Sequence, residues 1–293
     1  MDNLTDIGVV KQLLTRHGFS FSKSLGQNFL INPSVCPRIA ELGGASPETG
    51  VLEIGTGVGV LTAELAKRAK KVVAVEIDTR LLPVLDETLA EFDNVTIINE
   101  DILKVDLHRL IAEQFAGMDV VVCANLPYYI TSPVIMTLLE ARLPIRSITV
   151  MVQKEAAVRL CAKPGTREAG AVTIAVRYFS TPKQLFSVSR GSFMPAPNVD
   201  SAVIRLDVKQ PDFPDLDETV FFKTVRAAFS QRRKTAANSL SAGLSLPKDA
   251  VITALAQAGI PATARPEQLS MEQFAALSGA LAPFINSQNS SAQ

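Results

Sequence analysis

The chain has 293 residues, of which 47% are hydrophobic, so it can bury a large core and form one main domain with a smaller one beside it. Lysine plus arginine and aspartate plus glutamate each number 29, which excludes a uniformly basic nucleic-acid-binding protein and leaves only a local patch for such a partner. The three cysteines are far apart and form no ligand cluster with the two histidines, so neither a metal site nor a disulfide framework is expected.

The N-terminal residues lack the basic start and apolar core of a secretory signal. Nowhere does the chain hold about 18 consecutive uncharged apolar residues, the length that spans a bilayer. We therefore expect a cytoplasmic protein without a membrane partner.

From residue 50 to about residue 206, short apolar runs alternate with longer amphipathic stretches, which is typical of a parallel sheet covered by helices. Helices are expected at 60–69 and 80–89, where apolar residues recur at helical spacing. The expected strands are residues 51–54, 72–76, 95–99, 119–124 and 147–152, with two further β-rich runs, 171–178 and 201–208, that could complete the sheet or its edge. The pattern predicts an α/β, Rossmann-like fold.

After residue 208 the composition changes. A polar stretch broken by prolines covers residues 210–215, and helical patterns then continue to residue 284. We expect a first domain at residues 1–209 and a small all-helical domain at 210–285. The Ser/Asn/Gln-rich residues 286–293 are expected to be a disordered tail.

A glycine-rich loop, Glu-Ile-Gly-Thr-Gly-Val-Gly at residues 53–59, follows the first strand and opens a helix. Gly55 and Gly57 let the backbone turn tightly and approach a ligand, although an ordinary flexible turn is the plainer alternative. A dinucleotide fingerprint has its third glycine at the position of Val60, whereas this chain has it one place earlier, at Gly59. The spacing disfavours NAD and favours S-adenosylmethionine.

Two acidic residues follow the next two strands. Glu76 ends the second strand, where a carboxylate can accept both ribose hydroxyls of either cofactor, although a solvated strand end is the plainer alternative. Asp101 follows the third strand and can accept from an adenine amino group, while Ile77 and Ile102 sandwich the ring. Because the carboxyl ends of neighbouring strands meet at one edge, these acids and Asn125 are expected to line one site.

Asn125-Leu126-Pro127-Tyr128 directly follows the apolar run 119–124. The loop offers an amide oxygen, a carbonyl held by the fixed φ of Pro127, and the aromatic face of Tyr128. Two acceptors can draw on the protons of an exocyclic amine while the ring stacks on the base. An ordinary turn with a packing tyrosine also fits this loop alone. Together with the glycine-rich loop upstream, it predicts N-methylation of a nucleobase.

With these motifs, the chain resembles the KsgA/RsmA family of 16S ribosomal RNA adenine dimethyltransferases over nearly its whole length. The matching segments are residues 24–30, the Gly-rich loop 53–59, the catalytic loop 125–130, and the signatures 193–201 and 229–235. Five motifs in this order are specific, whereas any one alone is weak. The chain departs from many members at Ala236-Ala237, where bulkier or basic residues are usual.

The resemblance implies S-adenosylmethionine as the cofactor, with the motif at 24–30 closing over its methionine end. It implies that the target adenine is held by Asn125, Pro127 and Tyr128, with Phe193 as a second stacking face. The residues implied to contact the cofactor are Asn28, Leu30, Gly55, Glu76, Asp101 and Asn125.

The family transfers methyl groups to N6 of two adjacent adenosines in the 3′-terminal hairpin loop of small-subunit RNA. The resemblance therefore implies 16S rRNA and the assembling small ribosomal subunit as partners, and we expect a monomer. Residues 1–209 would be the catalytic domain. The helical domain would bind RNA, because residues 219–246 contain no acid but five cations that could contact phosphates: Lys223, Arg226, Arg232, Arg233 and Lys234. A solvated helix face is the plainer alternative.

Other functions remain open at this point. An adenine methyltransferase acting on large-subunit RNA, of the macrolide-resistance type, shares most of the motifs, and a DNA adenine methylase is also possible. The signature at 231–234 and the length of the chain argue against the large-subunit enzyme. A non-catalytic nucleic-acid-binding factor on the same fold is disfavoured because Asn125, Pro127 and Tyr128 are intact.

Overall fold

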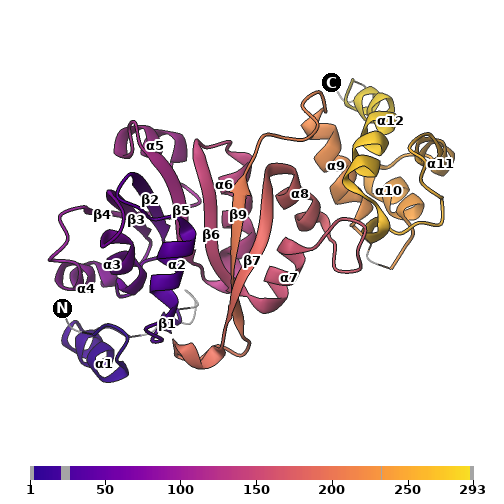
Figure 1. Cartoon of the computed structure of the whole chain (residues 1–293). Helices are drawn as coiled ribbons and strands as arrows, with labels where there is room; N and C mark the ends of the chain where they lie inside the picture. The colour runs from indigo at the N-terminus through magenta and orange to yellow at the C-terminus, as the bar shows by residue number, and fades with distance from the viewer. Residues whose placement is uncertain (1–2, 21–26, 232, 291–293) are drawn as a thin grey trace. The chain divides into compact units, whose positions relative to one another are not determined.

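The computed structural model describes residues 3–20, 27–231 and 233–290. Ser24, Leu25 and Gly26 of the N-terminal motif, Arg232, and the end of the expected tail lie outside the described residues. The chain divides into two compact units (Figure 1). The first comprises Met1–Ala157 and Ser180–Val208, and the second comprises Val158–Phe179 and Lys209–Gln293.

A seven-stranded sheet forms the centre of the first unit, with the strand order β4-β3-β2-β5-β6-β9-β7. Its strands are β2 (Thr49–Ile54), β3 (Lys71–Glu76), β4 (Val95–Asn99), β5 (Asp119–Asn125), β6 (Ile145–Gln153), β7 (Ser180–Val188) and β9 (Ser201–Val208). The strands from β4 to β6 are parallel, whereas β9 and β7 pair antiparallel at one edge. The middle strands are nearly continuous apolar runs because helices bury parallel strands on both faces.

Helices connect these strands. They are α1 (Ile7–Arg16), α2 (Val35–Gly43), α3 (Val60–Ala66), α4 (Leu82–Thr88), α5 (Leu107–Gln114), α6 (Thr131–Glu140) and α7 (Lys154–Cys161), with short 3-10 turns η1 (Thr79–Leu81), η2 (Tyr128–Ile130) and η3 (Arg190–Ser192). Apolar side chains of α2 and α3 pack on one face of the sheet in a shared core. A two-stranded antiparallel ribbon, β1 (Phe29–Leu30) with β8 (Phe193–Met194), brings two distant motifs together.

The predicted strands at 51–54, 72–76, 95–99, 119–124, 147–152 and 201–208 are all present. The prediction of a strand at 171–178 is wrong, because Ala171–Phe179 is helix α8. The segment contains the β-branched residues Val172, Thr173, Ile174 and Val176, which favour strands when sequence alone is considered, but here they are packed in a helix. The seventh strand is instead β7, which was not predicted: it is polar and contains Pro182, as an edge strand can.

The second unit consists of α8 with α9 (Glu218–Ala228), α10 (Ala236–Leu244), α11 (Lys248–Gln257), η4 (Pro266–Gln268) and α12 (Met271–Ser290). Residues 158–179 therefore group with the C-terminal helices and not with the sheet, unlike the expected linear division at 209/210. The reason is long-range packing: the ring of Tyr178 lies 5.2 Å from the rings of both Phe221 and Phe222 on α9.

Small residues allow α9 and α10 to pack closely. A Cβ atom at Gly243 would lie only 2.9 Å from Ala227, so the two helices meet backbone to backbone. Ala236 and Ala237 are both buried. Their small size therefore serves the core of this unit.

The expected disordered tail differs from the structure, because α12 continues to Ser290. A helix already formed adds further residues at little cost, and Ile285 is buried near this end. Within the described ranges, no helix is long and apolar enough to cross a membrane. The same residues contain no group of three or more histidine, cysteine or acidic side chains placed to hold a metal ion.

Candidate active site

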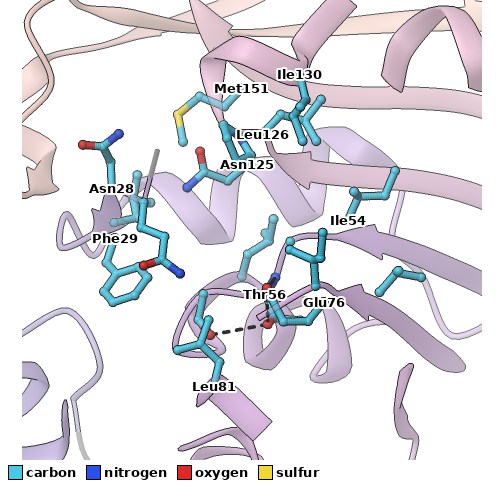
Figure 2. A pocket seen from close by; sticks show the side chains of 18 of the residues that line it. Asn28, Phe29, Ile54, Thr56, Glu76, Leu81, Asn125, Leu126, Ile130 and Met151 are labelled. Carbon is cyan, nitrogen blue, oxygen red and sulfur yellow. Dashed lines mark hydrogen bonds between the residues drawn. The ribbon is translucent and has the colours of Figure 1, made fainter. Parts of the chain in front are cut away.

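A cavity of about 330 Å³ lies in the first unit, at the carboxyl ends of β2, β3, β4 and β5. Figure 2 shows that Asn28, Thr56, Glu76 and Asn125 reach it from four separate segments. All the residues predicted to bind the cofactor or the target base line this one cavity: Asn28, Leu30, Gly55, Gly57, Glu76, Ile77, Asp101, Ile102, Asn125, Pro127, Tyr128 and Phe193.

The glycine-rich loop lines the cavity with residues 55–58. Gly55 has a φ of 75° and Gly57 a φ of 55°, which side chains other than glycine rarely adopt. A Cβ atom at Gly55 would lie 3.9 Å from the carbonyl oxygen of Asn125. The glycine-rich loop and the loop that begins at Asn125 therefore approach each other at Gly55.

Glu76 is held in place by the loop above it. Its Oε2 accepts hydrogen bonds from the Thr56 backbone N–H at 2.9 Å and the Thr56 hydroxyl at 3.0 Å, and its Oε1 accepts from the Asp78 N–H at 2.9 Å. The side chain is buried, and Oε2 already accepts two hydrogen bonds, whereas Oε1 keeps a lone pair for a further donor. This geometry suits a ribose hydroxyl at Oε1.

Asp78 is a residue that the sequence analysis missed. Its carboxylate accepts from the Arg80 guanidinium at 2.6 Å and from Gln27 Nε2 at 2.8 Å, and the hydrogen bonds from Arg80 lower the pKa of Asp78. Gln27 belongs to the N-terminal motif. Asp78 therefore links that motif to the end of β3, beside Glu76.

One wall of the cavity is formed by Ile77 and by residues 100–103, which include the two acids Glu100 and Asp101. Ile102 is buried, whereas the side chains of Ile77 and Leu103 are 51% and 43% exposed at the opening. Asp101 Oδ1 accepts from the Leu103 N–H at 3.1 Å, which fixes the carboxylate at this wall. An aromatic ring between Ile77 and Ile102 would have the Asp101 carboxylate near its edge.

Asn125 ends β5 and lies in register with the buried Met151 of β6. The Pro127 carbonyl accepts from the Ile130 N–H at 3.1 Å, which closes the first turn of η2, and it accepts a long hydrogen bond from the Thr131 hydroxyl at 3.5 Å. In the described chain, no backbone N–H donates to the carbonyl of Leu126. The loop thus offers the Asn125 amide oxygen together with either of two neighbouring carbonyls.

Two aromatic residues flank this loop. The Tyr128 hydroxyl lies 2.7 Å from the hydroxyl of Ser201, and burial raises the pKa of Tyr128. Phe193 is buried and pairs with Leu30 in the β1–β8 ribbon. Tyr128 and Phe193 therefore enter the cavity from different elements, as two faces for one planar base require.

Glu53 opens the glycine-rich motif but does not line the cavity. Burial raises the pKa of its carboxyl group to about 8, so the group is neutral at pH 7. The Thr62 hydroxyl is near enough to counter part of this rise, yet it makes no hydrogen bond of acceptable geometry with either Glu53 oxygen. Burial likewise raises the pKa of Cys123 nearby to about 12.

The family model described as "Ribosomal RNA adenine dimethylase" matches residues 18–282. The chain belongs to this family. It is 54% identical over 283 residues to the ribosomal RNA small subunit methyltransferase A of Geobacillus thermodenitrificans, covering 95% of this chain and 97% of that protein. It is 53% identical over 276 residues to the protein of the same name from Bacillus mycoides, covering 92% of this chain and 94% of that protein.

Solved structures show the same fold. A dimethyladenosine transferase from Plasmodium falciparum superimposes with a TM-score of 0.73 at 27% identity, over 87% of this chain and 98% of that one. The 23S rRNA methyltransferase ErmE superimposes with a TM-score of 0.66 at 30% identity, over 87% of this chain and 100% of that one. The protein is thus a methyltransferase with a Rossmann-like sheet and a C-terminal helical region, as the sequence predicted.

The residues predicted to bind RNA belong to the second unit, whereas the residues that line the cavity belong to the first. Lys223 and Arg226 are on α9, and Arg233 and Lys234 precede α10. Arg226, Arg233 and Lys234 are exposed and Lys223 is partly exposed. None of these four has an ion pair with an acid in the described part of the chain, so all four charges are available to a polyanion.

Proposed function

We propose that this protein transfers methyl groups from S-adenosylmethionine to N6 of two adjacent adenosines in the 3′-terminal hairpin loop of the small-subunit ribosomal RNA. The observation that carries the proposal is that residues suited to the cofactor and residues suited to the target base line one cavity. Glu76 and Asp101 lie on one side, and Asn125 and Tyr128 lie on the other.

The residues on the first side fit S-adenosylmethionine. Glu76, whose two oxygens are oriented by Thr56 and Asp78, would accept a ribose hydroxyl at Oε1, and Asp101 would accept from the adenine amino group. Ile77 and Ile102 would hold the adenine ring, with Asn28, Leu30 and Gly57 lining the rest of the cavity. When bound, this cofactor supplies a methyl group that is already activated on a sulfonium.

The residues on the second side fit an unstacked adenine. Tyr128 and Phe193 would stack on its two faces, and the Asn125 amide oxygen would accept one N6 proton. The carbonyl of Pro127 or Leu126 would accept the other. Two acceptors on N6 keep its lone pair directed at the methyl carbon, so alignment supplies most of the catalysis. The proton released after transfer can pass to solvent.

The small-subunit target is supported by relatives more than half identical over nearly their whole length, whose name specifies the small subunit. The likeness to ErmE, which is named for 23S rRNA, is lower at 30% identity. We infer that the protein acts as a monomer in the cytoplasm during late assembly of the small subunit, and that the four basic residues of the second unit contact its RNA.

The target can be tested by supplying the purified protein with radiolabelled S-adenosylmethionine and one of two substrates. Undermethylated small subunits should accept label, at up to four methyl groups per subunit, because two adenosines each take two. Protein-free large-subunit RNA should accept none. Label on large-subunit RNA alone would instead assign the macrolide-resistance type of activity.

A further inference from the structure

Two exposed cations stand at the edge of the sheet where the acceptor loop lies. Gln153 of β6, Ser201 of β9 and Val188 of β7 lie side by side across the antiparallel part of the sheet. They lie at the same end of the sheet as Asn125, the last residue of β5. Lys154, the first residue of α7, directly follows the end of β6, and Arg190, the first residue of η3, lies two residues after the end of β7. Both cations therefore project from the rim on the acceptor side.

Asp200 fixes the backbones of both residues. The Lys154 N–H donates to the Asp200 carbonyl at 3.0 Å, and the Arg190 N–H donates to Asp200 Oδ1 at 3.0 Å. The next residue, Ser201, makes the 2.7 Å hydrogen bond to Tyr128. Lys154 and Arg190 are thus hydrogen-bonded to Asp200, the residue that precedes Ser201, the partner of Tyr128.

These two side chains have no ion pair with an acid among the residues that the structure describes. Among the arginines in the described residues of the first unit, Arg190 alone has a side chain with no hydrogen bond, ion pair or ring contact. Lys154 is exposed and likewise has no ion pair in this part of the chain. Of the nearby acids, Asp200 has one oxygen occupied by the Arg190 N–H, and Glu155 has an interaction of its own.

An exposed aromatic ring stands in the same loop as the acceptor. Tyr129 follows Tyr128, lines the cavity opening, and is 59% exposed. Val199, beside Asp200, is also exposed at 44%. Exposed rings next to unpaired cations are how proteins bind single-stranded nucleic acid, with bases on the rings and phosphates on the cations.

We propose that Lys154 and Arg190 bind the phosphates of the unpaired strand next to the target adenosine, and that Tyr129 stacks on a neighbouring base. The inference rests on the proposed function, because an adenosine that leaves its stack to enter the cavity carries its flanking phosphates to the rim. This rim surface, made of Tyr129, Lys154, Arg190 and Val199, would position the strand so that N6 enters the pocket.

The test uses a synthetic RNA hairpin with two adjacent adenosines in its loop and the full chain carrying Lys154→Gln and Arg190→Gln. Affinity is measured by fluorescence anisotropy over a range of salt concentrations. Each phosphate contact to a single strand contributes about 0.7 to the log–log salt slope, so two lost contacts should reduce its magnitude by about 1.4. KM for the hairpin should rise about tenfold, while kcat and the affinity for S-adenosylmethionine stay unchanged.

The matched control is Lys67→Gln with Arg109→Gln, which removes the same total charge from the C-cap of α3 and from α5, where both cations already have acidic partners. This variant should keep the wild-type slope. The swap Lys154→Arg with Arg190→Lys should also keep it, because both charges remain. Tyr129→Leu should weaken binding about tenfold without changing the slope.

A Lys154→Gln, Arg190→Gln variant that keeps the wild-type salt slope and KM would overturn the proposal. A binding defect seen only with assembled subunits would also overturn it, because it would indicate contact with a ribosomal protein. Unchanged affinity in Tyr129→Leu would overturn the stacking part. Failure of the proposed function is seen separately: the wild-type protein would then transfer no methyl group to the hairpin or to small subunits, whatever the salt slopes of the variants.

Discussion

The hydroxyl of Tyr128 lies 2.7 Å from the hydroxyl of Ser201, which joins the acceptor loop to a strand 73 residues further along the chain. Ser201 is completely buried and starts β9. The hydrogen bond fixes how far the Tyr128 ring extends over the cavity. The ring therefore does not need to be ordered by the substrate, which lowers the entropy lost on binding.

We expect Ser201→Ala to lower kcat/KM for RNA about tenfold, because the half-buried Tyr128 hydroxyl loses its partner and the ring is no longer fixed. The affinity for S-adenosylmethionine, measured by calorimetry, should not change. Tyr128→Phe provides the matched partner for a double-mutant cycle. If the hydrogen bond is the shared cause, the double variant loses little more than either single one, whereas fully additive losses would contradict this role.

Asn125→Ala should lower methyl transfer by about 10²–10³-fold, since it removes an acceptor that acts on N6 during transfer. Binding of S-adenosylmethionine should be largely kept, because Glu76 and Asp101 remain. Single-turnover methylation and calorimetry measure the two effects, with thermal unfolding as the control for folding. Near-wild-type transfer would remove Asn125 from the proposed mechanism.

Glu76→Ala should weaken binding of S-adenosylmethionine about 10- to 100-fold, the range expected when hydrogen bonds to a charged group are lost. Thr56→Val is a milder variant for comparison with Glu76→Ala. It removes only the hydroxyl that donates to Glu76 at 3.0 Å and keeps the Thr56 backbone N–H that also donates to Glu76. We expect a smaller loss for Thr56→Val, measured by calorimetry. Equal affinity in wild type and Glu76→Ala would refute the ribose assignment.

The neutral carboxyl of Glu53 makes stability depend on pH. Its pKa is about 8 in the folded protein and 4.5 in the unfolded chain, so between these values only the unfolded chain releases the proton. Stability should therefore fall as pH rises from about 5 to about 8, at up to about 1.4 kcal/mol per pH unit from this group.

Urea unfolding of wild type and Glu53→Gln at several pH values measures this effect. The variant should lose the contribution, so the difference in unfolding free energy between the two proteins grows with pH in the variant's favour. Cys123 does not interfere, because its raised pKa of about 12 keeps the thiol neutral over this range. Parallel pH profiles for the two proteins would contradict a neutral Glu53.

Much of the site could be predicted from sequence because of one topological rule. Glu76, Asp101 and Asn125 each follow an apolar run, and the carboxyl ends of parallel strands meet at one edge. The residues that orient them were not predictable in this way. Thr56 and Ser201 are ordinary hydroxyl residues, and their partners become visible only when strands distant in sequence are adjacent.

The fold was predictable where burial follows a simple period and not where it is irregular. Helix α8 is buried on several sides, so its valines and isoleucine resemble a strand. Arg177 of α8 donates to the carbonyls of Cys161 and Ala162, a contact between segments that no local pattern reveals. Strand β7 is polar because it lies at the edge of the sheet, and polar edge strands look like loops in sequence.

The activity assigned to this chain is methylation of N6 of two adjacent adenosines in small-subunit RNA. Mass-spectrometric mapping of that RNA tests it most directly, in cells that lack the protein and in the same cells supplied with wild type or Asn125→Ala. We predict that dimethylation at the two adenosines of the 3′-terminal hairpin loop disappears without the protein, returns with wild type, and stays absent with the variant. Full dimethylation at both adenosines in cells without the protein would contradict the account.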